Sequence, residues 1–346
     1  DHIMTINPQE PSHYEELNNI LLKKASGKSL HVLHSWSLLE DMSENNALNF
    51  GYFSLLEIAR TLLKNTDFSE VNIDCLTANA YSVLGDESLL PINTTIHSAL
   101  KVMRKEYKKL STRCIEVNLA HINIPLIEEV FYSNLDKDCV SIRGAKLWEP
   151  YYQELPLERA SSSQESFEQQ GVYLITGASG GIGTVVSHYL REKYDARLLL
   201  VVRKKPSDEF KNWIEQQEGT AHYIVDDLSD SLSLKNKVQE VLTQWNHQLD
   251  GAFHTAGVVD NAGLITKRKA SDCMQVFQPK IQGTINLSEA IDSNKPRFVV
   301  LFSSLASIFA PYGQIGYVAA NAFQNAFAKS KSGTESQYIS VLWDTW

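Results

Sequence analysis

A glycine-rich turn in the second half of the chain carries the residue types that bind a dinucleotide phosphate. Residues 176–183 read TGASGGIG; an apolar run precedes them, and a helical stretch, TVVSHYLREKY, follows directly. In this context Gly177 permits a tight turn, Gly181 lets the backbone approach a pyrophosphate, and Gly183 allows close helix–strand packing. The helix N-terminus adds N–H groups and a positive dipole. A flexible loop is the alternative; the residues predicted to bind a cofactor are Gly177, Ser179, Gly180, Gly181, Ile182 and Gly183.

The next two apolar runs end in charged residues that bear on the identity of the cofactor. Arg203 follows the second run and lies 20 residues after Gly183, where enzymes that prefer NAD place an acid against the ribose 2′-hydroxyl. A cation there fits a 2′-phosphate, so the sequence favours NADPH over NADH; a solvated basic loop is the alternative. Asp227 and Leu228 end the third run, where the carboxylate is predicted either to reach the adenine amine or to begin a turn.

Four polar residues further along form a second group with chemical potential. Tyr317 and Asn321 are four residues apart and therefore share one face of a predicted helix. Ser304 stands 13 residues earlier, at the C-terminal end of a predicted strand, where open α/β sheets bind ligands. Lys280 lies on the preceding predicted helix, 24 residues before the serine. Each residue alone has a structural interpretation, such as a packed ring or a helix cap, but their combination with the glycine turn predicts a catalytic site.

Predicted strands and helices alternate along the whole chain, which favours parallel sheets covered by helices. Six strands suit a doubly wound Rossmann sheet in the second half, at residues 172–176, 197–202, 222–225, 252–254, 298–303 and 338–342. The first half is predicted to hold strands at 30–36, 71–77 and 113–119 and helices at 52–64, 95–107 and from Pro125 onward. It has no glycine-rich turn after a strand. We therefore predict an α/β chain with two Rossmann-like subdomains, of which only the second binds a dinucleotide.

Length, composition and charge exclude several classes of protein. The 346 residues correspond to about two domains, with the polar stretch 159–170 as the linker between domains 1–158 and 171–346. The net charge of −9 argues against nucleic-acid binding. No run approaches 18 apolar residues and no signal pattern opens the chain, so we expect a cytoplasmic location and no membrane contact. Four scattered cysteines indicate free thiols, with no metal site and no disulfide.

The motifs together resemble the short-chain dehydrogenase/reductase superfamily. The matching segments are TGASGGIG, HTAG at residues 254–257, and the serine and tyrosine at 304 and 317. Usual members carry lysine four residues after the tyrosine, whereas this chain has Asn321 there and a lysine at 280. That exchange is similar to the ketoreductase domains of modular polyketide synthases, as are LLLVVRK, FSSLAS, YVAANAF and VLWDTW. In the first half, NFGYFSLLEIARTLL, LTANAYSVLGDE and RGAKLWEPYYQ resemble the structural subdomain of that family, a truncated Rossmann unit without cofactor.

The resemblance implies NADPH-dependent reduction of a β-ketoacyl thioester to a β-hydroxyacyl thioester. Tyr317 is then the proton donor to the developing alkoxide, and Lys280 the cation that lowers the pKa of the phenol and holds the nicotinamide ribose. Ser304 would hydrogen-bond the ketone oxygen, and Asn321 would orient the lysine and a relay water. The implied partners are an acyl carrier protein, which presents the substrate on its phosphopantetheine arm, and flanking synthase domains.

Other positions bear on cofactor binding and on stereochemistry. Ala256 and Gly257 of the HTAG segment join the predicted cofactor-binding set. The family often shows Leu-Asp-Asp after the fourth strand, where this chain has Val-Asp260-Asn261, and Phe309 stands where the opposite stereochemical class carries tryptophan. The retained acid and the missing tryptophan favour the D-hydroxyl (B-type) product. The resemblance also implies a lid and one more strand after VLWDTW, which this sequence lacks, and its abrupt ends suggest a piece of a longer protein.

Two other functions remain open on the sequence alone. A non-catalytic scaffold domain of the same kind of multienzyme would explain the first half, which lacks a glycine turn, and it need not bind NADPH. A freestanding short-chain reductase of small ketones or sugars would act on free ketones rather than thioesters. The additional Rossmann half and the position of Lys280 argue against the freestanding enzyme.

Overall fold

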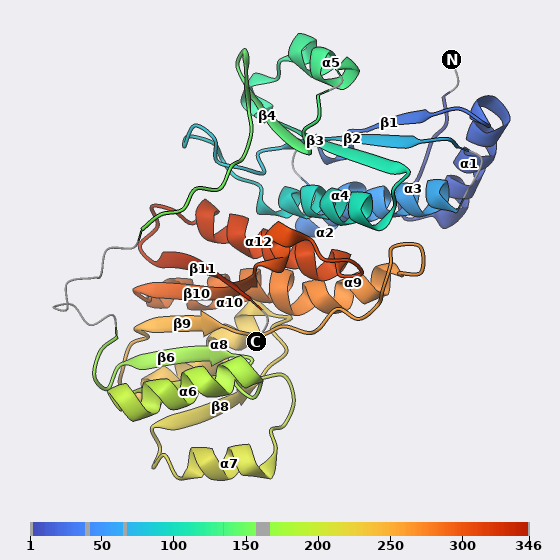
Figure 1. Cartoon of the computed structure of the whole chain (residues 1–346). Coiled ribbons are helices and arrows are strands. Elements are labelled where there is room, and N and C mark those ends of the chain that lie inside the picture. The colour runs from blue at the N-terminus through green and yellow to red at the C-terminus, as the bar shows by residue number, and fades with distance from the viewer. Residues whose placement is uncertain (1–2, 39–41, 65–67, 134, 157–166, 345–346) are drawn as a thin grey trace. The chain divides into compact units, whose positions relative to one another are not determined.

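The computed structural model describes residues 3–38, 42–64, 68–133, 135–156 and 167–344 and confirms the predicted α/β fold class. Its strands form two sheets, sheet A from β1 to β5 and sheet B from β6 to β11 (Figure 1). Packing divides the chain into two compact units. The sheet A unit comprises Asp1–Tyr151, Asp260–Met274 and Leu305–Ser330, and the sheet B unit comprises Tyr152–Val259, Gln275–Ser304 and Lys331–Trp346. The boundaries 1–158 and 171–346, drawn along the sequence, stay a prediction.

Sheet B is a parallel sheet of six strands whose order reverses once. The order is β11-β10-β9-β6-β7-β8, which is the doubly wound arrangement with β6 as first strand. The strands are β6 Val172–Thr176, β7 Arg197–Val202, β8 Ala221–Val225, β9 Gly251–His254, β10 Phe298–Ser304 and β11 Gln337–Trp343. All six predicted strands are confirmed, with ends that differ by at most one residue. The chain turns back between β6 and β9, so this edge is where an open α/β sheet binds its ligands.

Helices cover both faces of sheet B, with α6 on one face and α8 and α10 on the other (Figure 1). The helical segments that follow these strands are α6 Gly181–Tyr194, α7 Asp208–Glu215, α8 Ser231–Trp245, α9 Ala270–Phe277, the π-helical turn η5 Gln278–Gln282, α10 Gly283–Ile291 and the 3₁₀ turn η6 Asp292–Asn294. Apolar strand residues such as Ile175 and Leu200 form the core beneath α6. Phe167, predicted within the linker, packs its ring against Tyr173 and Phe253 of this core. Linker residues 159–166 lie outside the described residues.

Sheet A has four parallel strands in sequential order, and β5 pairs antiparallel with β4. The strands are β1 Leu30–His34, β2 Val71–Ala78, β3 Leu110–Val117, β4 Cys139–Arg143 and β5 Lys146–Trp148. Three predicted strand ends are wrong, the first of them the start of the third strand, which begins at Leu110 and not at Arg113. The first strand stops at His34 because a 3₁₀ turn, Trp36–Leu38, follows it. The third stops at Val117 because the Asn118 side chain accepts the Ala120 N–H and begins a turn.

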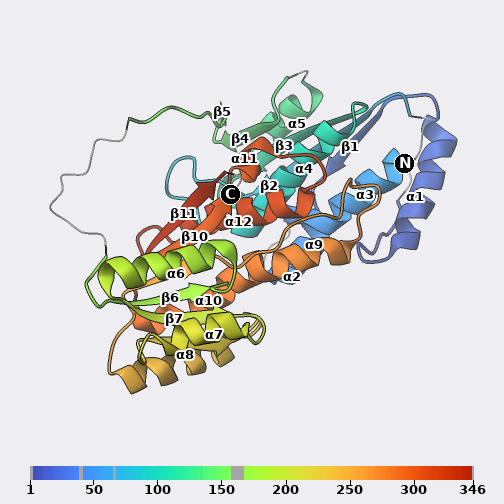
Figure 2. The ribbon, with the colours of Figure 1, turned by 60° about the horizontal axis from the view of Figure 1, so that its bottom comes forward.

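Helices pack on both faces of sheet A, α4 on one and α5 on the other (Figure 1). The helical segments are α1 Pro11–Ala25, η1 Trp36–Leu38, α2 Glu44–Ala47, the π-helix η2 Leu48–Phe53, α3 Ser54–Leu63, η3 Pro91–Asn93, α4 Thr94–Glu106, η4 Leu119–His121, α5 Ile124–Tyr132, α11 Ala306–Phe309 and α12 Ile315–Ser330. α1 packs beside α3 (Figure 2), and α12 packs along α4. Across the described residues, no helix is both long and apolar enough to cross a membrane.

Candidate active site

The glycine turn begins at the point where the strand order of sheet B reverses. Thr176, the last residue of β6, is the register partner of His254, the last residue of β9, so two loops start side by side. Gly177 has φ +68°, and a Cβ there would lie 2.8 Å from the Ala256 Cα and N atoms. A Cβ at Gly183 would lie 2.4 Å from the Gly177 carbonyl oxygen. Both positions therefore accept glycine alone, which is the tight geometry that the sequence spacing predicts.

Between these two glycines the turn leaves its backbone accessible. Helix α6 begins at Gly181 with Gly180 as N-cap, and no described side chain caps it. A Cβ at Gly181 would meet no heavy atom within 4 Å, so a ligand can approach its backbone closely. Ser179 and Ile182 stand beside it in the same turn. The first N–H groups of a helix have no intrahelical partner and attract anions, so this turn fits the pyrophosphate of a dinucleotide.

Two more strand ends carry the residues predicted to select the cofactor. Arg203 follows β7 and is exposed, as a group that binds a 2′-phosphate must be. Asp227 follows β8; a hydrogen bond from the Ser229 hydroxyl lowers the pKa of its carboxyl group, so the side chain is a carboxylate. Leu228 is buried with φ +61°, and its carbonyl accepts a hydrogen bond of 2.7 Å from Asn286 Nδ2. The chain therefore presents both charges at the edge where the glycine turn lies.

Lys280 lies buried against the loop that follows β9. A Cβ at Gly257 would lie 3.1 Å from the lysine Cε, so glycine at 257 makes room for this side chain. The lysine Nζ donates a hydrogen bond of 2.8 Å to the carbonyl oxygen of Phe302, two residues before Ser304 at the end of β10. Burial lowers the pKa of Lys280 to about 7. Sheet B thus brings Ala256, Gly257, Lys280 and Ser304 to one edge.

His254 connects the glycine turn to the lysine and was not assigned a role from the sequence. Its Nδ1 lies 2.7 Å from the Thr176 hydroxyl, and its Nε2 lies 3.0 Å from the Pro279 carbonyl oxygen. Because a carbonyl only accepts, Nε2 carries the proton and Nδ1 accepts from the threonine. Burial lowers the pKa of His254 to about 3, so the ring is neutral. This chain of hydrogen bonds fixes the π-helical turn that carries Lys280. In the sequence, the only indication of this role was a histidine at the end of an apolar strand.

The sheet A unit holds the other two predicted catalytic residues on α12. Asn321 Nδ2 donates a hydrogen bond of 2.7 Å to the Tyr317 carbonyl oxygen, one turn earlier, so the two residues follow each other along one face as predicted. The backbone N–H of Tyr317 donates to Asp260 Oδ2 at 3.0 Å. Asp260 therefore holds the first turn of α12. The convergence of Tyr317 and Asn321 with Lys280 and Ser304, which belong to the other unit, stays a prediction.

Asp260 is the centre of a buried charged cluster that the sequence did not reveal. Arg268 is fully buried and donates to both Asp260 carboxylate oxygens, at 2.7 and 2.9 Å, and to the Gly313 carbonyl oxygen at 2.6 Å. Glu106 of α4 accepts the backbone N–H groups of Ile265 and Gly313, both at 2.9 Å. The cluster fixes the loop before α12 and thereby the position of Tyr317 on its unit.

The three residues predicted to control stereochemistry have different environments. The Asp260 carboxylate is engaged by Arg268 and by α12, so its observed contacts are structural. Asn261 is exposed, and the Phe309 side chain is 63% exposed. Both exposed side chains are accessible to a ligand, and their part in stereocontrol stays a prediction.

Comparison with known proteins gives matches over both halves of the chain. A sequence model described as the KR domain matches residues 171–346, and one described as beta-ketoacyl synthase-like, N-terminal, matches residues 1–134. The spectinabilin polyketide synthase system protein NorA′ of Streptomyces orinoci is 31% identical over 216 residues, which cover 61% of this chain. Polyketide synthase PksN of Bacillus subtilis (strain 168) is 25% identical over 362 residues, covering 98% of this chain. The chain spans about 6% of the length of each.

Solved structures match the fold. The crystal structure of an N-terminal ketoreductase from the macrolactin assembly line has a TM-score of 0.82 and 22% sequence identity. The match covers 100% of this chain and 72% of that chain. Both halves therefore share the architecture of that ketoreductase, and the family resemblance stated from the motifs is confirmed.

Proposed function

The chain belongs to the KR domain family, and from this premise we propose that it reduces a β-ketoacyl thioester to a β-hydroxyacyl thioester with NADPH. The observation that carries the proposal is the buried Lys280 amine. It lies at the C-terminal edge of β10, against the loop after β9, and that loop begins beside the glycine turn. A lysine amine that carries a proton on the acid side of its pKa, beside a phosphate-binding turn, suits a reaction in which negative charge develops on a ketone oxygen.

The residues at this edge fit NADPH. The backbone of the turn from Gly177 to Gly183 would hold the pyrophosphate, and Arg203 would pair with the 2′-phosphate. Asp227 and Leu228 would border the adenine, and Ala256 with Gly257 would line the path toward the nicotinamide. When bound, the reduced nicotinamide supplies a hydride to the ketone carbon.

The protein's own residues handle the proton and the developing charge. Tyr317 donates its phenolic proton to the ketone oxygen as that oxygen becomes an alkoxide. Lys280 is the proposed cation that stabilises the phenolate formed when Tyr317 gives up its proton. Ser304 donates a hydrogen bond to the same oxygen, and Asn321 orients the lysine and a water that returns the proton.

The relatives supply the rest of the proposal. The proteins that match are polyketide synthases much longer than this chain, so the proposed setting is a cytoplasmic multienzyme of that kind with flanking synthase domains. The proposed substrate arrives as a thioester on the phosphopantetheine arm of an acyl carrier protein. The retained acid Asp260 and the phenylalanine at 309 in place of tryptophan support a D-hydroxyl product, whereas Asn261 departs from the Leu-Asp-Asp pattern of that class.

The test is the rate of NADPH oxidation with a β-ketoacyl thioester of N-acetylcysteamine. Tyr317→Phe removes the proposed proton donor, and we expect kcat to fall by about 10²- to 10⁴-fold. Tyr132→Phe removes an exposed hydroxyl in the sheet A unit and serves as the matched control, with an unchanged rate expected. Equal rates in the wild type and Tyr317→Phe contradict the proposed role of Tyr317.

Two further measurements separate the alternatives. Fluorescence titration with NADPH reports binding without turnover, and no binding by the wild-type chain would favour a non-catalytic scaffold. Activity on free ketones together with none on thioesters would favour a freestanding reductase. The configuration of the alcohol formed from a racemic α-methyl β-ketothioester tests the proposed D-hydroxyl product.

A further inference from the structure

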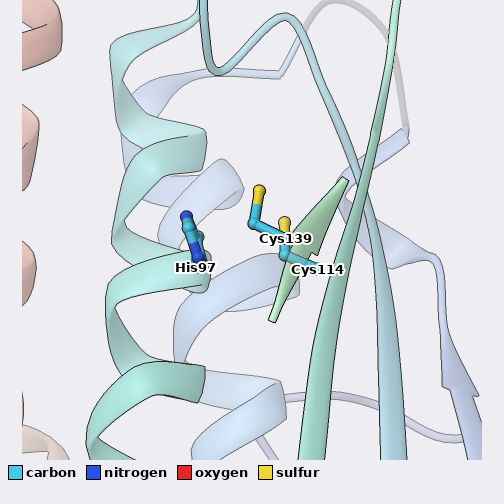
Figure 3. Close-up of side chains that lie close together, drawn as sticks. All are labelled: His97, Cys114 and Cys139. Atoms are coloured by element: carbon cyan, nitrogen blue, oxygen red, sulfur yellow. The ribbon is translucent and has the colours of Figure 1, made fainter. Parts of the chain in front are cut away.

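Two cysteines and a histidine meet on one buried face of sheet A (Figure 3). His97 comes from α4, Cys114 from β3 and Cys139 from β4. Cys114 and Cys139 are register partners on neighbouring strands, so their side chains point to the same face. One ring nitrogen and the two sulfur atoms all lie within 4.8 Å of one another, and all three side chains are at most 2% exposed.

The histidine has one nitrogen that its surroundings leave unsatisfied. Its Nδ1 contacts the Tyr81 hydroxyl, whereas Nε2 is buried without a hydrogen-bond partner among the described residues. A buried polar atom without a partner costs about 1–3 kcal/mol, so a native structure that keeps one needs a reason. In a neutral imidazole one nitrogen carries a proton and the other holds a lone pair. If Nδ1–H donates to Tyr81, that lone pair is on Nε2.

We propose that His97, Cys114 and Cys139 bind a thiophilic metal ion, Zn²⁺. Two thiolates and an imidazole are the ligands that zinc prefers, and a metal-ligating histidine commonly donates its other N–H to a neighbouring oxygen, as Tyr81 allows here. Two sulfurs bound to tetrahedral zinc, with Zn–S bonds of about 2.3 Å, are about 3.8 Å apart. The two sulfur atoms, which lie within 4.8 Å of each other, therefore need to close by about 1 Å or less.

Charge favours zinc over a monovalent ion at this site. Zn²⁺ and two thiolates make a neutral group, which is the least costly form to bury. Cu⁺ with the same ligands would leave one buried negative charge. On binding, two S–H bonds break, two Zn–S bonds form, and both protons leave to solvent, so no oxidant or reductant is needed. The hydroxyl of Thr77, 3.4 Å from the Cys114 sulfur, adds a polar neighbour to that ligand.

The sequence suggested free thiols because the three ligands are far apart along the chain and form no CxxC pair. The same sheet provides a matched control. Cys75 of β2 is the register partner of Cys114 and is as deeply buried, but its sulfur contacts His34 Nδ1 at 3.4 Å. Cys75 is thus a buried thiol in an equivalent setting that is not part of the proposed site.

The experiment uses the whole 346-residue chain, freed of metal by a chelator under anaerobic conditions. Titration with Co²⁺ should give a thiolate-to-cobalt charge-transfer band that saturates at one equivalent and disappears when Zn²⁺ is added. Cys139→Ala should weaken binding by more than about 100-fold, since loss of a ligand exceeds the effect of losing a ligand's neighbour. Cys75→Ala should bind as the wild type does. NADPH titration of each protein reports separately on the proposed function.

Several outcomes would overturn the proposal. A wild-type chain that takes up neither Co²⁺ nor Zn²⁺ contradicts it, whatever the variants do. Equal metal affinity in the wild type and Cys139→Ala contradicts the assigned ligands, and binding of Cu⁺ without Zn²⁺ or Co²⁺ contradicts the assigned ion. If Cys139→Ala does not fold by circular dichroism, His97→Gln makes the same test, with the same loss expected, because it removes the imidazole ligand and leaves both thiols.

Discussion

Parallel strands joined by helices form all of sheet B and the first four strands of sheet A, but the order of the strands reverses only in sheet B. In sheet B the loops after β6 and β9 start side by side, and one of them is the glycine turn. In sheet A the four parallel strands follow in sequence, and the polar cluster formed by His97, Cys114 and Cys139 lies under α4 within the core. Similar layers thus lead to an open edge suited to a large organic ligand and to a closed interior suited to a small ion.

The largest effect expected from this contrast concerns the glycines. Gly183→Ala places a Cβ against the Gly177 carbonyl, and we expect a loss of more than about 4 kcal/mol in the free energy of unfolding. Gly181→Ala meets no atom and should keep the fold while weakening NADPH binding. Gly144 in the β4–β5 turn has φ +59° and open surroundings, so Gly144→Ala should cost about 1–2 kcal/mol and leave NADPH binding unchanged.

Urea denaturation and NADPH titration of the three variants test this prediction. If Gly183→Ala is as stable as Gly144→Ala, the turn is not rigid and the interpretation of sheet B as the preformed site fails. If Gly181→Ala binds NADPH as the wild type does, the cofactor does not approach that backbone.

Arg268 gives the next largest effect, this time in the sheet A unit. Arg268→Met leaves the Asp260 carboxylate buried without its partner and should cost about 3–5 kcal/mol. Arg104→Met removes an exposed pair with Asp138 and should cost about 1 kcal/mol or less. Because Asp260 also holds the N–H of Tyr317, Arg268→Met should lower kcat at temperatures where the protein stays folded. Thermal unfolding compares the two variants, and equal losses would show that the buried pair does not stabilise α12.

Replacement of Lys280 should raise the stability of the fold and lower the activity. In the wild type, a Lys280 pKa lowered from 10.5 to about 7 corresponds to roughly 4–5 kcal/mol of lost stability near neutral pH. Lys280→Met removes this cost, but it also loses the hydrogen bond to Phe302, which contributes about 1–3 kcal/mol. Lys280→Met should therefore be more stable than the wild type by about 2 kcal/mol at pH 7 and nearly inactive. Lys329→Met, on the exposed end of α12, should change neither property.

The sign of the pH dependence follows from the same shift. Between pH 7 and 10.5 the unfolded lysine binds a proton that the folded one does not, so wild-type stability rises with pH in this window. The advantage of Lys280→Met should therefore be largest near pH 7 and shrink toward pH 10. Urea midpoints at pH 7 and 9 measure it, and an advantage that grows with pH would mean that the folded lysine keeps its proton.

The sequence predicted elements better than it predicted contacts. Runs such as 172–176 and 197–202 are apolar on both faces and bounded by turn residues, so local pattern alone identifies the strands of sheet B. The pattern did not predict β4 or β5, which are short, nor the two π-helical segments. The tight turn from Gly177 to Gly183 could be predicted because its residues form one local motif.

The contacts that fix the site come from residues distant in sequence. In the sequence, Arg268 lies in the charged run TKRK, which is typical of a surface segment. Only the fold brings its side chain to Asp260 and Gly313. His254 ends an apolar strand, and its partner Pro279 lies 25 residues later. Local periodicity carries no information about such pairs, because strand register and crossover packing decide them.

The smallest expected effect concerns the choice of cofactor at the edge of sheet B. Arg203→Ala removes an exposed cation that would pair with a 2′-phosphate, and a charge-assisted hydrogen bond contributes about 1.5–3 kcal/mol. We expect the Kd for NADPH to rise by about 10- to 100-fold while the Kd for NADH stays constant. Lys235→Ala on α8 is the control for a general loss of positive charge. Equal losses of affinity for both cofactors in Arg203→Ala would place the arginine near a group that they share, and the predicted preference for NADPH would have no basis at this position.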